Sequence, residues 1–249
     1  INPDYIKVPE PVYDTPEARH DYARFLSMAR IADHAFGVVY DTLRENDLLE
    51  NTIVMFTTDH GIAFPFMKCR LYDDGIGVAL IMRLPGERGG RGRVIDEMVS
   101  HLDVFPTLCE CTGLEKPDWL EGVSLIPLFD KTSDTVREEI CAEINYHGNA
   151  YQPTRCIRTP RYKYIRRFGD TPQPVGISTD ASPPGEFLKR HGSMERMQPR
   201  EELYDLFFDP RERNNLAGDT GMSSVQTDLA GRLDTWMKQT NDPLLTGDI

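Results

Sequence analysis

The chain of 249 residues is long enough for one large domain, or for two smaller ones, with a substantial buried core. Hydrophobic residues make up 39% of it and charged residues 27%, which indicates a soluble globular protein. A formal net charge of -12 argues against nucleic acid as a partner. No run approaches the roughly 20 apolar residues that span a bilayer, so we expect no membrane partner. No signal peptide is visible, and the sequence leaves the compartment open.

The first predicted element is a long amphipathic helix. Thr15, Pro16 and Glu17 form a typical helix start, with a capping hydroxyl, a proline in the first turn and an acid behind it. The helix should end near Asn46 and Asp47. The apolar residues between these points recur at spacings of three and four and define one face: Tyr22, Leu26, Ala29, Ala32, Phe36, Val39 and Leu43.

Two apolar runs follow, over residues 52–58 and 78–82. Neither run alternates with polar residues, which favours buried strands of a parallel sheet under helices. Residues 94–99 can form a further short strand. A second helix is expected to begin at Asp103 and to end at Gly113, because glycine is common just after the last turn of a helix.

Beyond about residue 140 the pattern changes to short β-like runs. They cover residues 155–158, 162–168 and 202–207, and a loop rich in Pro, Gly and Ser separates the last two over residues 171–185. A closing amphipathic helix is expected over residues 223–240. This order predicts a small antiparallel sheet with a helix packed on it.

The predicted fold class is therefore α/β. We expect residues 1–140 to contribute part of a mixed, mostly parallel sheet flanked by helices. Residues 141–249 should form a separate C-terminal α+β subdomain. In open α/β sheets ligands bind at the carboxyl ends of strands, so the residues after the 52–58 run are the first candidates for a functional site.

Asp59 and His60 stand directly after that run, and Gly61 permits close approach of the backbone. A carboxylate suits Ca²⁺ or Mg²⁺, whereas an imidazole suits transition metals better, so the pair alone does not choose a metal. Lys68 follows as a single cation in an apolar setting. A solvated surface position is the simplest interpretation of Lys68. The apolar flanks suggest partial burial instead, and a buried ammonium group is costly unless an anion binds it.

The segment from Thr57 to Gly61, with Lys68 and the following Leu71-Tyr72, resembles the sulfatase family of the alkaline-phosphatase superfamily. The family phrase is Thr-Ser-Asp-Asn/His-Gly, and the nearest branch is heparan N-sulfatase (sulfamidase) with its bacterial relatives. Further matching segments are residues 100–108, 122–128, 142–147, 155–164, 202–205 and 209–216. The resemblance thus covers most of the chain and corresponds to the C-terminal portion of a sulfatase.

The resemblance implies roles for individual residues. Asp59 would be a metal ligand, and His60 would be a second ligand or a donor to a sulfate oxygen. The metal would be Ca²⁺, with Mg²⁺ also compatible. Lys68 would be the catalytic cation that contacts the sulfate. His147, at the end of a β-like run, could touch the substrate, although a hydrogen-bonded loop histidine is an equally good interpretation.

The resemblance also shows what this sequence lacks. Sulfatases convert a Cys or Ser in a Cys/Ser-x-Pro-x-Arg motif into the nucleophile formylglycine, and no residue of this chain has that context. An Asp-Asp pair that completes the metal shell is absent as well. We therefore expect the nucleophile in an N-terminal half outside this sequence, on the same polypeptide or another chain, and expect this chain alone to be inactive.

Two classes of function stay open. The first is a hydrolase of sulfate esters or N-sulfates on a sulfated sugar or a related small molecule. An enzymatic variant of it is a phosphoric or phosphonic monoester hydrolase of the same superfamily. The second class is a non-catalytic, sulfatase-like module that binds anions or glycans.

Asp73 and Asp74 look like a carboxylate pair, but they lie in a segment that resembles a structural turn of the family, and we interpret them as loop caps.

Overall fold

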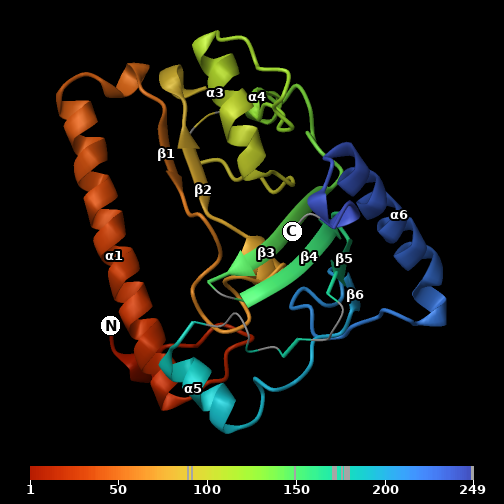
Figure 1. Ribbon diagram of the computed structural model, residues 1–249. Coiled ribbons are helices and arrows are strands. Elements are labelled where there is room, and N and C mark those ends of the chain that lie inside the picture. The colour runs from red at the N-terminus through yellow and green to blue at the C-terminus, as the bar shows by residue number, and fades with distance from the viewer. Residues whose placement is uncertain are drawn as a thin grey trace. The chain divides into compact units, whose positions relative to one another are not determined.

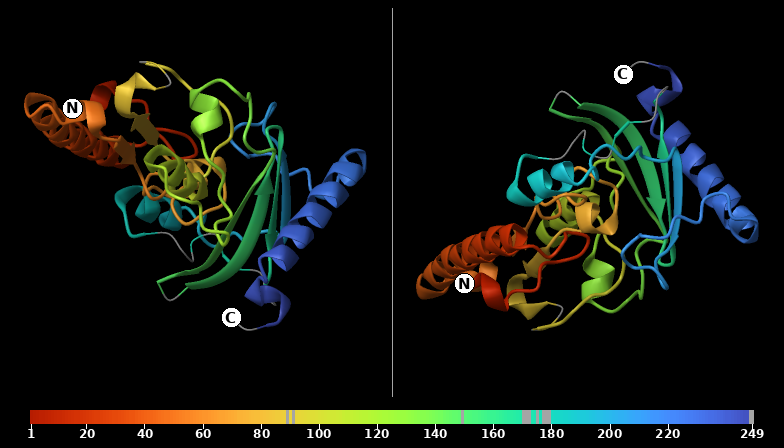
Figure 2. Two further views of the ribbon diagram at one scale, coloured as in Figure 1. Left: turned by 90° about the horizontal axis from the view of Figure 1, so that it is seen from above. Right: turned by 90° about the horizontal axis from the view of Figure 1, so that it is seen from below.

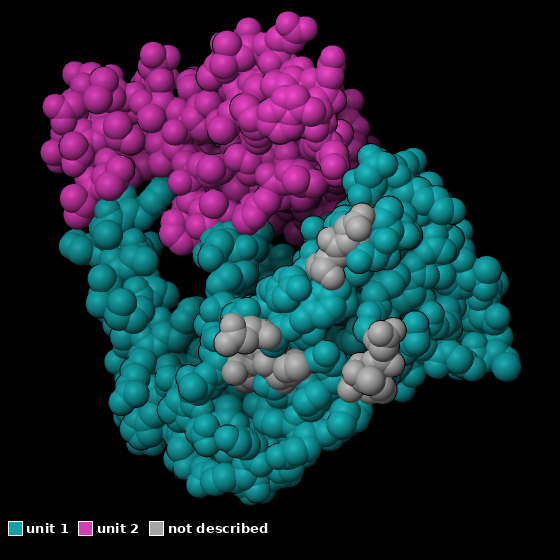
Figure 3. Space-filling view, in the orientation of Figure 1, with its two compact units in different colours: residues 1–36, 58–79, 141–249 teal, residues 37–57, 80–140 magenta. Residues whose placement is uncertain are grey.

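The computed structural model describes residues 1–88, 90, 92–148, 150–169, 173, 174, 176 and 180–247. These residues form two compact units (Figure 3): unit 1 comprises residues 1–36, 58–79 and 141–249, and unit 2 comprises residues 37–57 and 80–140. The C-terminal segment thus shares a unit with two earlier segments. The predicted domain boundary near residue 140 stays a prediction.

Six α-helices and six strands are assigned among the described residues (Figure 1). The helices are α1 (Pro16–Glu45), α2 (Asp73–Ile76), α3 (Val104–Thr112), α4 (Ile126–Phe129), α5 (Pro183–Arg190) and α6 (Ser223–Gln239). The strands are β1 (Val54–Thr57), β2 (Leu80–Arg83), β3 (Ile140–His147), β4 (Ala150–Arg158), β5 (Tyr162–Arg167) and β6 (Glu201–Asp205). Among the described residues, no helix is long and apolar enough to cross a membrane.

Helix α1 confirms the first predicted element almost to the residue. The Thr15 hydroxyl accepts a hydrogen bond from the amide of Ala18 at 3.2 Å, which caps the first turn as the sequence predicts. The N-terminal part of its apolar face packs in unit 1, where Tyr22 lies against Phe64 and Phe25. Farther along, the same face is exposed, and Val39 retains 57% of its accessible surface.

Strands β1 and β2 are neighbours, as predicted, but they are antiparallel rather than parallel. The first and last residues of the connection between them are hydrogen-bonded, because the amide of Thr58 donates to the carbonyl of Ala79 at 3.3 Å. The end of β1 is thereby brought beside the start of β2, which fixes the antiparallel direction. The predicted burial of both faces is also wrong for β2, where Ile81 is 64% exposed, since a sheet of two strands offers few neighbours.

Two further expectations for unit 2 have different outcomes. The predicted helix is present as α3, and Gly113 ends it in the left-handed conformation at φ 71°. The short strand expected over residues 94–99 does not form, and Val94 is 76% exposed. A β-branched residue favours a strand only where a neighbouring strand and a covered face are available.

The C-terminal sheet of unit 1 has the order β3-β4-β5-β6, one strand more than predicted, with antiparallel pairing between β4, β5 and β6. Helix α6 covers one face of it, as both views of Figure 2 show. Residues alternate between the faces. Ile157, Tyr164 and Leu203 pack against Leu229 and Leu233 of α6 and form the largest hydrophobic core.

The opposite face of this sheet is covered by the segment that contains α2. Cys156, Ile165 and Tyr204 point to this side and pack with Leu71 and Tyr72. The segment between β1 and β2 therefore lies on the C-terminal sheet, within the same compact unit. This packing brings the residues after β1 close to residues that lie more than eighty positions later in the chain.

Candidate functional site

The candidate site begins with Asp59, His60 and Gly61, two residues beyond the end of β1. The amide of Gly61 donates to the carbonyl of Gly75 at 2.9 Å. A Cβ atom at position 61 would lie 1.9 Å from the carbonyl oxygen of Asp74, so only glycine fits. The chain is thus held against α2 immediately after the two candidate ligands.

His60 has a defined hydrogen bond through one ring nitrogen. Its Nδ1 lies 2.6 Å from the carbonyl oxygen of Gly61, and a carbonyl only accepts, so Nδ1 is the donor. In the neutral ring Nε2 then carries the lone pair. This is the arrangement found for metal-binding histidines, which usually donate their other ring N–H to a carbonyl or carboxylate.

Asp59 lies on the same side as that free nitrogen. Its Oδ2 is 3.5 Å from Nε2 of His60, and its side chain is 87% exposed. One oxygen atom and one nitrogen atom that can bind a metal ion therefore lie close together at the surface. Among the residues that the structure describes, no group of three or more His, Cys, Asp or Glu side chains could hold a metal ion. The pair fits two positions of a coordination shell, and a hard cation such as Ca²⁺ needs about six.

Lys68 lies in a tight loop after Gly61, with positive φ angles at Phe66 (69°) and Cys69 (61°). Its Nζ donates to Oδ2 of Asp180 at 2.8 Å, and its side chain is 28% exposed. This hydrogen bond raises the pKa of Lys68 and lowers that of Asp180, against the smaller effect of burial in each case. Both groups are therefore charged near neutral pH.

His147, the last residue of β3, reaches the same carboxylate. Its Nε2 lies 3.5 Å from Oδ1 of Asp180, and its side chain is 28% exposed. The charges of His147 and His60 also contribute to the lowered pKa of Asp180. Lys68 and His147, two of the four residues predicted from the sequence, thus contact one carboxylate. His60 acts on this carboxylate through its charge, and Asp59 is next to His60.

A small cavity adjoins the ion pair, lined by Ala63, Phe64, Pro65, Lys68 and Asp180. Its volume of about 10 Å³ leaves room for roughly one water molecule. A tetrahedral anion is larger than a water molecule and does not fit into this cavity beside the Asp180 carboxylate.

Asp180 is the site residue that the sequence analysis missed. It lies at the end of the loop predicted over residues 171–185, much of which is outside the described residues, and no periodic pattern singles it out. The only cue in the sequence is an acid two positions before Ser182, the residue that caps α5 by accepting a hydrogen bond from the amide of Gly185. Helix α5 itself begins inside the predicted loop, because Pro183 and Pro184 fit the first turn of a helix.

A second hollow lies within unit 2. It has a volume of about 550 Å³ and includes several arginines in its lining. Two of these already have acidic partners, since Arg83 pairs with Glu50 at 2.6 Å and Arg88 donates to Asp130 at 2.8 Å. Their charges are neutralised within the unit, and we assign this hollow no role in the chemistry.

The cysteines do not supply a nucleophile at the candidate site. Cys156 is fully buried in the C-terminal sheet, and burial raises the pKa of its thiol to about 11. Cys69 is next to Lys68, but burial raises its pKa as well. A protonated thiol is a poor nucleophile, so both side chains are packing residues by their surroundings.

Comparison with protein families gives two matches. The model of the sulfatase family matches residues 3–114, and the model of the C-terminal region of N-sulphoglucosamine sulphohydrolase matches residues 59–186, which includes every candidate site residue. The resemblance to the sulfatase family, inferred from residues 57–61 and Lys68, is thereby confirmed.

Individual relatives agree with this result. The chain is 30% identical over 200 residues to an ulvan-active sulfatase of Formosa agariphila, covering 79% of this chain and 39% of that protein. It is 26% identical over 261 residues to human N-sulphoglucosamine sulphohydrolase, covering 96% of this chain and 52% of that protein. The chain thus spans between about two fifths and one half of the length of these relatives.

Solved structures show the same fold. A 2-O GAG sulfatase superposes with a TM-score of 0.71 at 25% identity, over 92% of this chain and 45% of its own. The phosphonate monoester hydrolase of Agrobacterium radiobacter superposes with a TM-score of 0.62 at 25% identity, over 82% and 38% respectively.

Proposed function

Because the chain belongs to the sulfatase family, we propose that it carries the cation and part of the metal shell of a site that hydrolyses sulfate groups on sugars. One observation supports this most strongly. The Asp180 carboxylate is an anion held by Lys68 at 2.8 Å, with His147 at 3.5 Å and a weaker charge interaction from His60. A sulfate group carries the same charge on similar oxygens, so it can take the place of the carboxylate.

In this proposal Lys68 is the catalytic cation. Its ammonium group would contact a sulfate oxygen and stabilise the charge that develops when the bond from sulfur to the leaving oxygen or nitrogen breaks. His147 would orient the sugar or the sulfate from the end of β3. Asp180 would hold Lys68 until the substrate arrives and then release it.

Asp59 and His60 would hold a divalent cation, which supplies a fixed positive charge next to the sulfate. We propose Ca²⁺, because Asp59 is a carboxylate and such ligands suit a hard cation, with Mg²⁺ as the alternative. The remaining ligands would come from outside these 249 residues. The formylglycine nucleophile would also come from there, since no Cys or Ser of this chain stands in the required motif.

The proposal is tested with the protein in its full natural length, on a sulfate ester, a sulfamate and a phosphate monoester of the same leaving group. Hydrolysis of either sulfur compound at least tenfold faster than the phosphate supports a sulfatase. The opposite preference would identify a phosphoric or phosphonic monoester hydrolase instead. The similarity to the phosphonate monoester hydrolase keeps this alternative open. Tight sulfate binding without turnover of any substrate would identify a non-catalytic binding module.

A further inference from the structure

Lys163 on β5 is a charged residue with a fully buried side chain. Its neighbours Tyr162 and Tyr164 point to the face covered by α6, so Lys163 points to the other face together with Ile165. A buried ammonium group is strongly destabilising unless it is paired and hydrogen-bonded. The position of Lys163 therefore requires partners on the segment that covers this face.

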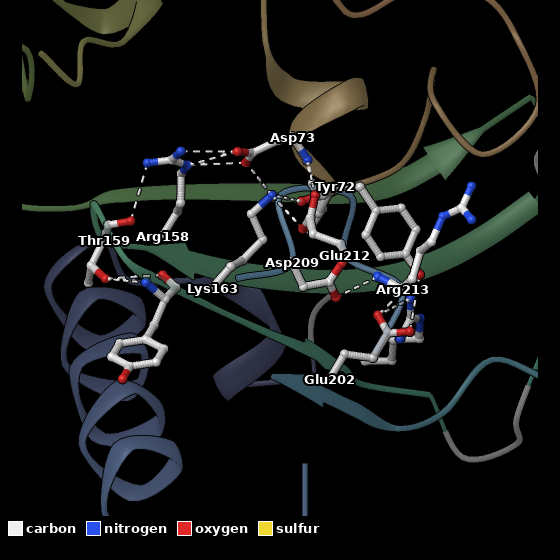
Figure 4. Close-up of polar contacts among 12 residues, drawn as sticks. Tyr72, Asp73, Arg158, Thr159, Lys163, Glu202, Asp209, Glu212 and Arg213 are labelled. Atoms are coloured by element: carbon white, nitrogen blue, oxygen red, sulfur yellow. Dashed lines mark hydrogen bonds and ion pairs between the residues drawn. The ribbon is translucent and has the colours of Figure 1, made fainter. Parts of the chain in front are cut away.

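Those partners lie at the start of α2 and in the loop after β6 (Figure 4). Nζ of Lys163 lies 2.5 Å from Oδ1 of Asp73 and 2.8 Å from Oε1 of Glu212, and it donates to the carbonyl of Leu71 at 3.1 Å. Arg158 pairs with the second oxygen of Asp73 at 3.0 Å. Two cations thus neutralise two carboxylates around the first residue of α2.

The pKa shifts of Asp73 and Glu212 reflect both their burial and their pairing with these cations. Burial alone would raise the pKa of Asp73, but Arg158 and Lys163 outweigh burial and lower it. Burial dominates at Glu212 and raises its pKa, although Lys163 opposes the shift. Glu212 also accepts a hydrogen bond from the amide of Asp73 at 2.5 Å. The cluster therefore holds both the side chain and the backbone of Asp73, which corrects the interpretation of Asp73 as a simple turn cap.

Helix α2 in turn touches both parts of the candidate site through its backbone. The carbonyl of Gly75 accepts from the amide of Gly61, the residue after His60. A Cβ atom at Gly75 would lie 2.4 Å from the carbonyl of Met67 and 2.3 Å from that of Arg70, the residues that bracket the Lys68 loop. A shift of α2 would therefore move His60 and Lys68 together.

We propose that Lys163 is a positioning residue for the site: through Asp73 and Glu212 it fixes α2, and α2 fixes the backbone that carries Asp59, His60 and Lys68. The catalytic part of this inference depends on the proposed function, whereas its structural part does not. Within the described part of the chain, the polar partners of the Lys163 ammonium group are Asp73, Glu212 and the carbonyl of Leu71, so Lys163 acts on the site through the backbone of α2.

The same sheet offers a matched control. Arg155 on β4 is also fully buried, and its Nε lies 2.6 Å from Oδ2 of Asp242, a carboxylate with 1% exposure. This pair ties the sheet to the segment after α6 and does not involve α2. Arg155 also pairs with Glu143 on β3 at 3.2 Å. Neutralising Arg155 should therefore destabilise the protein about as much as neutralising Lys163, without displacing α2 or the backbone of Asp59, His60 and Lys68.

The test compares Lys163→Met with Arg155→Met in the protein at its full natural length, under conditions where circular dichroism shows both variants folded. The first readout is hydrogen exchange of the Gly61 amide. The expected result for Lys163→Met is exchange at least tenfold faster than in the parent protein, with exchange in Arg155→Met within threefold of the parent. Equal exchange in the two variants would overturn the proposal, whether or not the protein is a sulfatase.

The second readout is kcat on a sulfated substrate, determined separately from KM. Lys163→Met should lower kcat at least tenfold, while Arg155→Met should leave kcat of the folded protein within twofold. If Lys163→Met does not fold, Glu212→Gln replaces it, because the amide oxygen of glutamine can still accept from Asp73 while the charge is lost. A smaller shift of Gly61 exchange in the same direction is then expected. Unchanged exchange in Glu212→Gln would refute the role of the cluster.

Discussion

Lys68 donates a hydrogen bond to Asp180 at 2.8 Å, although 112 positions separate the two residues along the chain. The hydrogen bond raises the pKa of Lys68 and lowers that of Asp180, each from its ordinary value. Both groups are therefore charged near neutral pH, and a substrate anion that binds Lys68 in the same way replaces a charged carboxylate. Asp180 acts in our account as an internal competitor for the anion site.

Asp180→Asn should strengthen binding of inorganic sulfate severalfold, because the amide does not compete for Lys68 by charge. The measurement is a sulfate titration followed by the ring proton resonances of His60 and His147. Asp14→Asn is the matched control, since Asp14 is also paired with a surface cation, Arg19, at 2.5 Å. Equal changes in sulfate affinity for the two substitutions would mean that sulfate binding depends only on the net charge of the protein.

Gly61→Ala should destabilise the protein, because the new Cβ would lie 1.9 Å from a backbone oxygen that cannot move independently of α2. We expect the free energy of unfolding to fall by about 1–3 kcal/mol, the usual cost of overpacking. Gly37→Ala is the control. It lies in α1 with nothing within 4 Å of its new Cβ, so it should gain roughly 0.5–1 kcal/mol. Denaturant unfolding measures both values, and a neutral Gly61→Ala would contradict the close contact with Asp74.

The pH dependence of stability should report the Lys163 cluster. The pKa of Asp73 is lower in the folded chain than in the unfolded one, so the unfolded state binds more protons at acidic pH. The stabilisation by Asp73 is complete above pH 3.8 and is lost as the pH falls through the folded value. Urea unfolding of parent and Asp73→Asn between pH 5 and pH 3 should show the steeper loss in the parent. Parallel curves would mean that Asp73 is not ion-paired in solution.

The sequence predicted the elements that local patterns determine. Thr15 and Pro16 indicated the start of α1, and Gly113 indicated the end of α3. The change to short β-like runs predicted the C-terminal sheet with α6. The antiparallel direction of β1 and β2 was not predictable, because an unbroken apolar run reports burial and carries no information on strand direction.

The candidate site was predictable only in part, for a related reason. Asp59, His60 and Lys68 are close in sequence and follow a strand, which made them visible as a motif. Asp180 comes from a loop without periodicity, and its contact with Lys68 depends on how two distant segments pack. The role of Lys163 was hidden in the same way, because a lysine between two tyrosines reads as an ordinary strand residue until its partners are known.

The chain by itself should show neither turnover of a sulfate ester nor tight Ca²⁺ binding, since two protein donors are too few for a hard cation. The protein in its full natural length should show both. Calcium titration and an aryl-sulfate or sulfamate assay on the two forms check this. Turnover by the 249 residues at a rate near that of the longer protein would place the nucleophile within them and refute our account of the missing groups.

The most direct test of the proposed site is the steady-state kcat/KM of Lys68→Ala in the full natural protein on its best sulfated substrate. One well-placed charged donor is worth about 3 kcal/mol in the transition state, so kcat/KM should fall roughly a hundredfold while the free energy of unfolding changes little. Lys238→Ala, at an exposed position near the end of α6, should leave both quantities unchanged. A kcat/KM for Lys68→Ala within twofold of the parent would contradict the assignment of Lys68 as the cation that holds the sulfate.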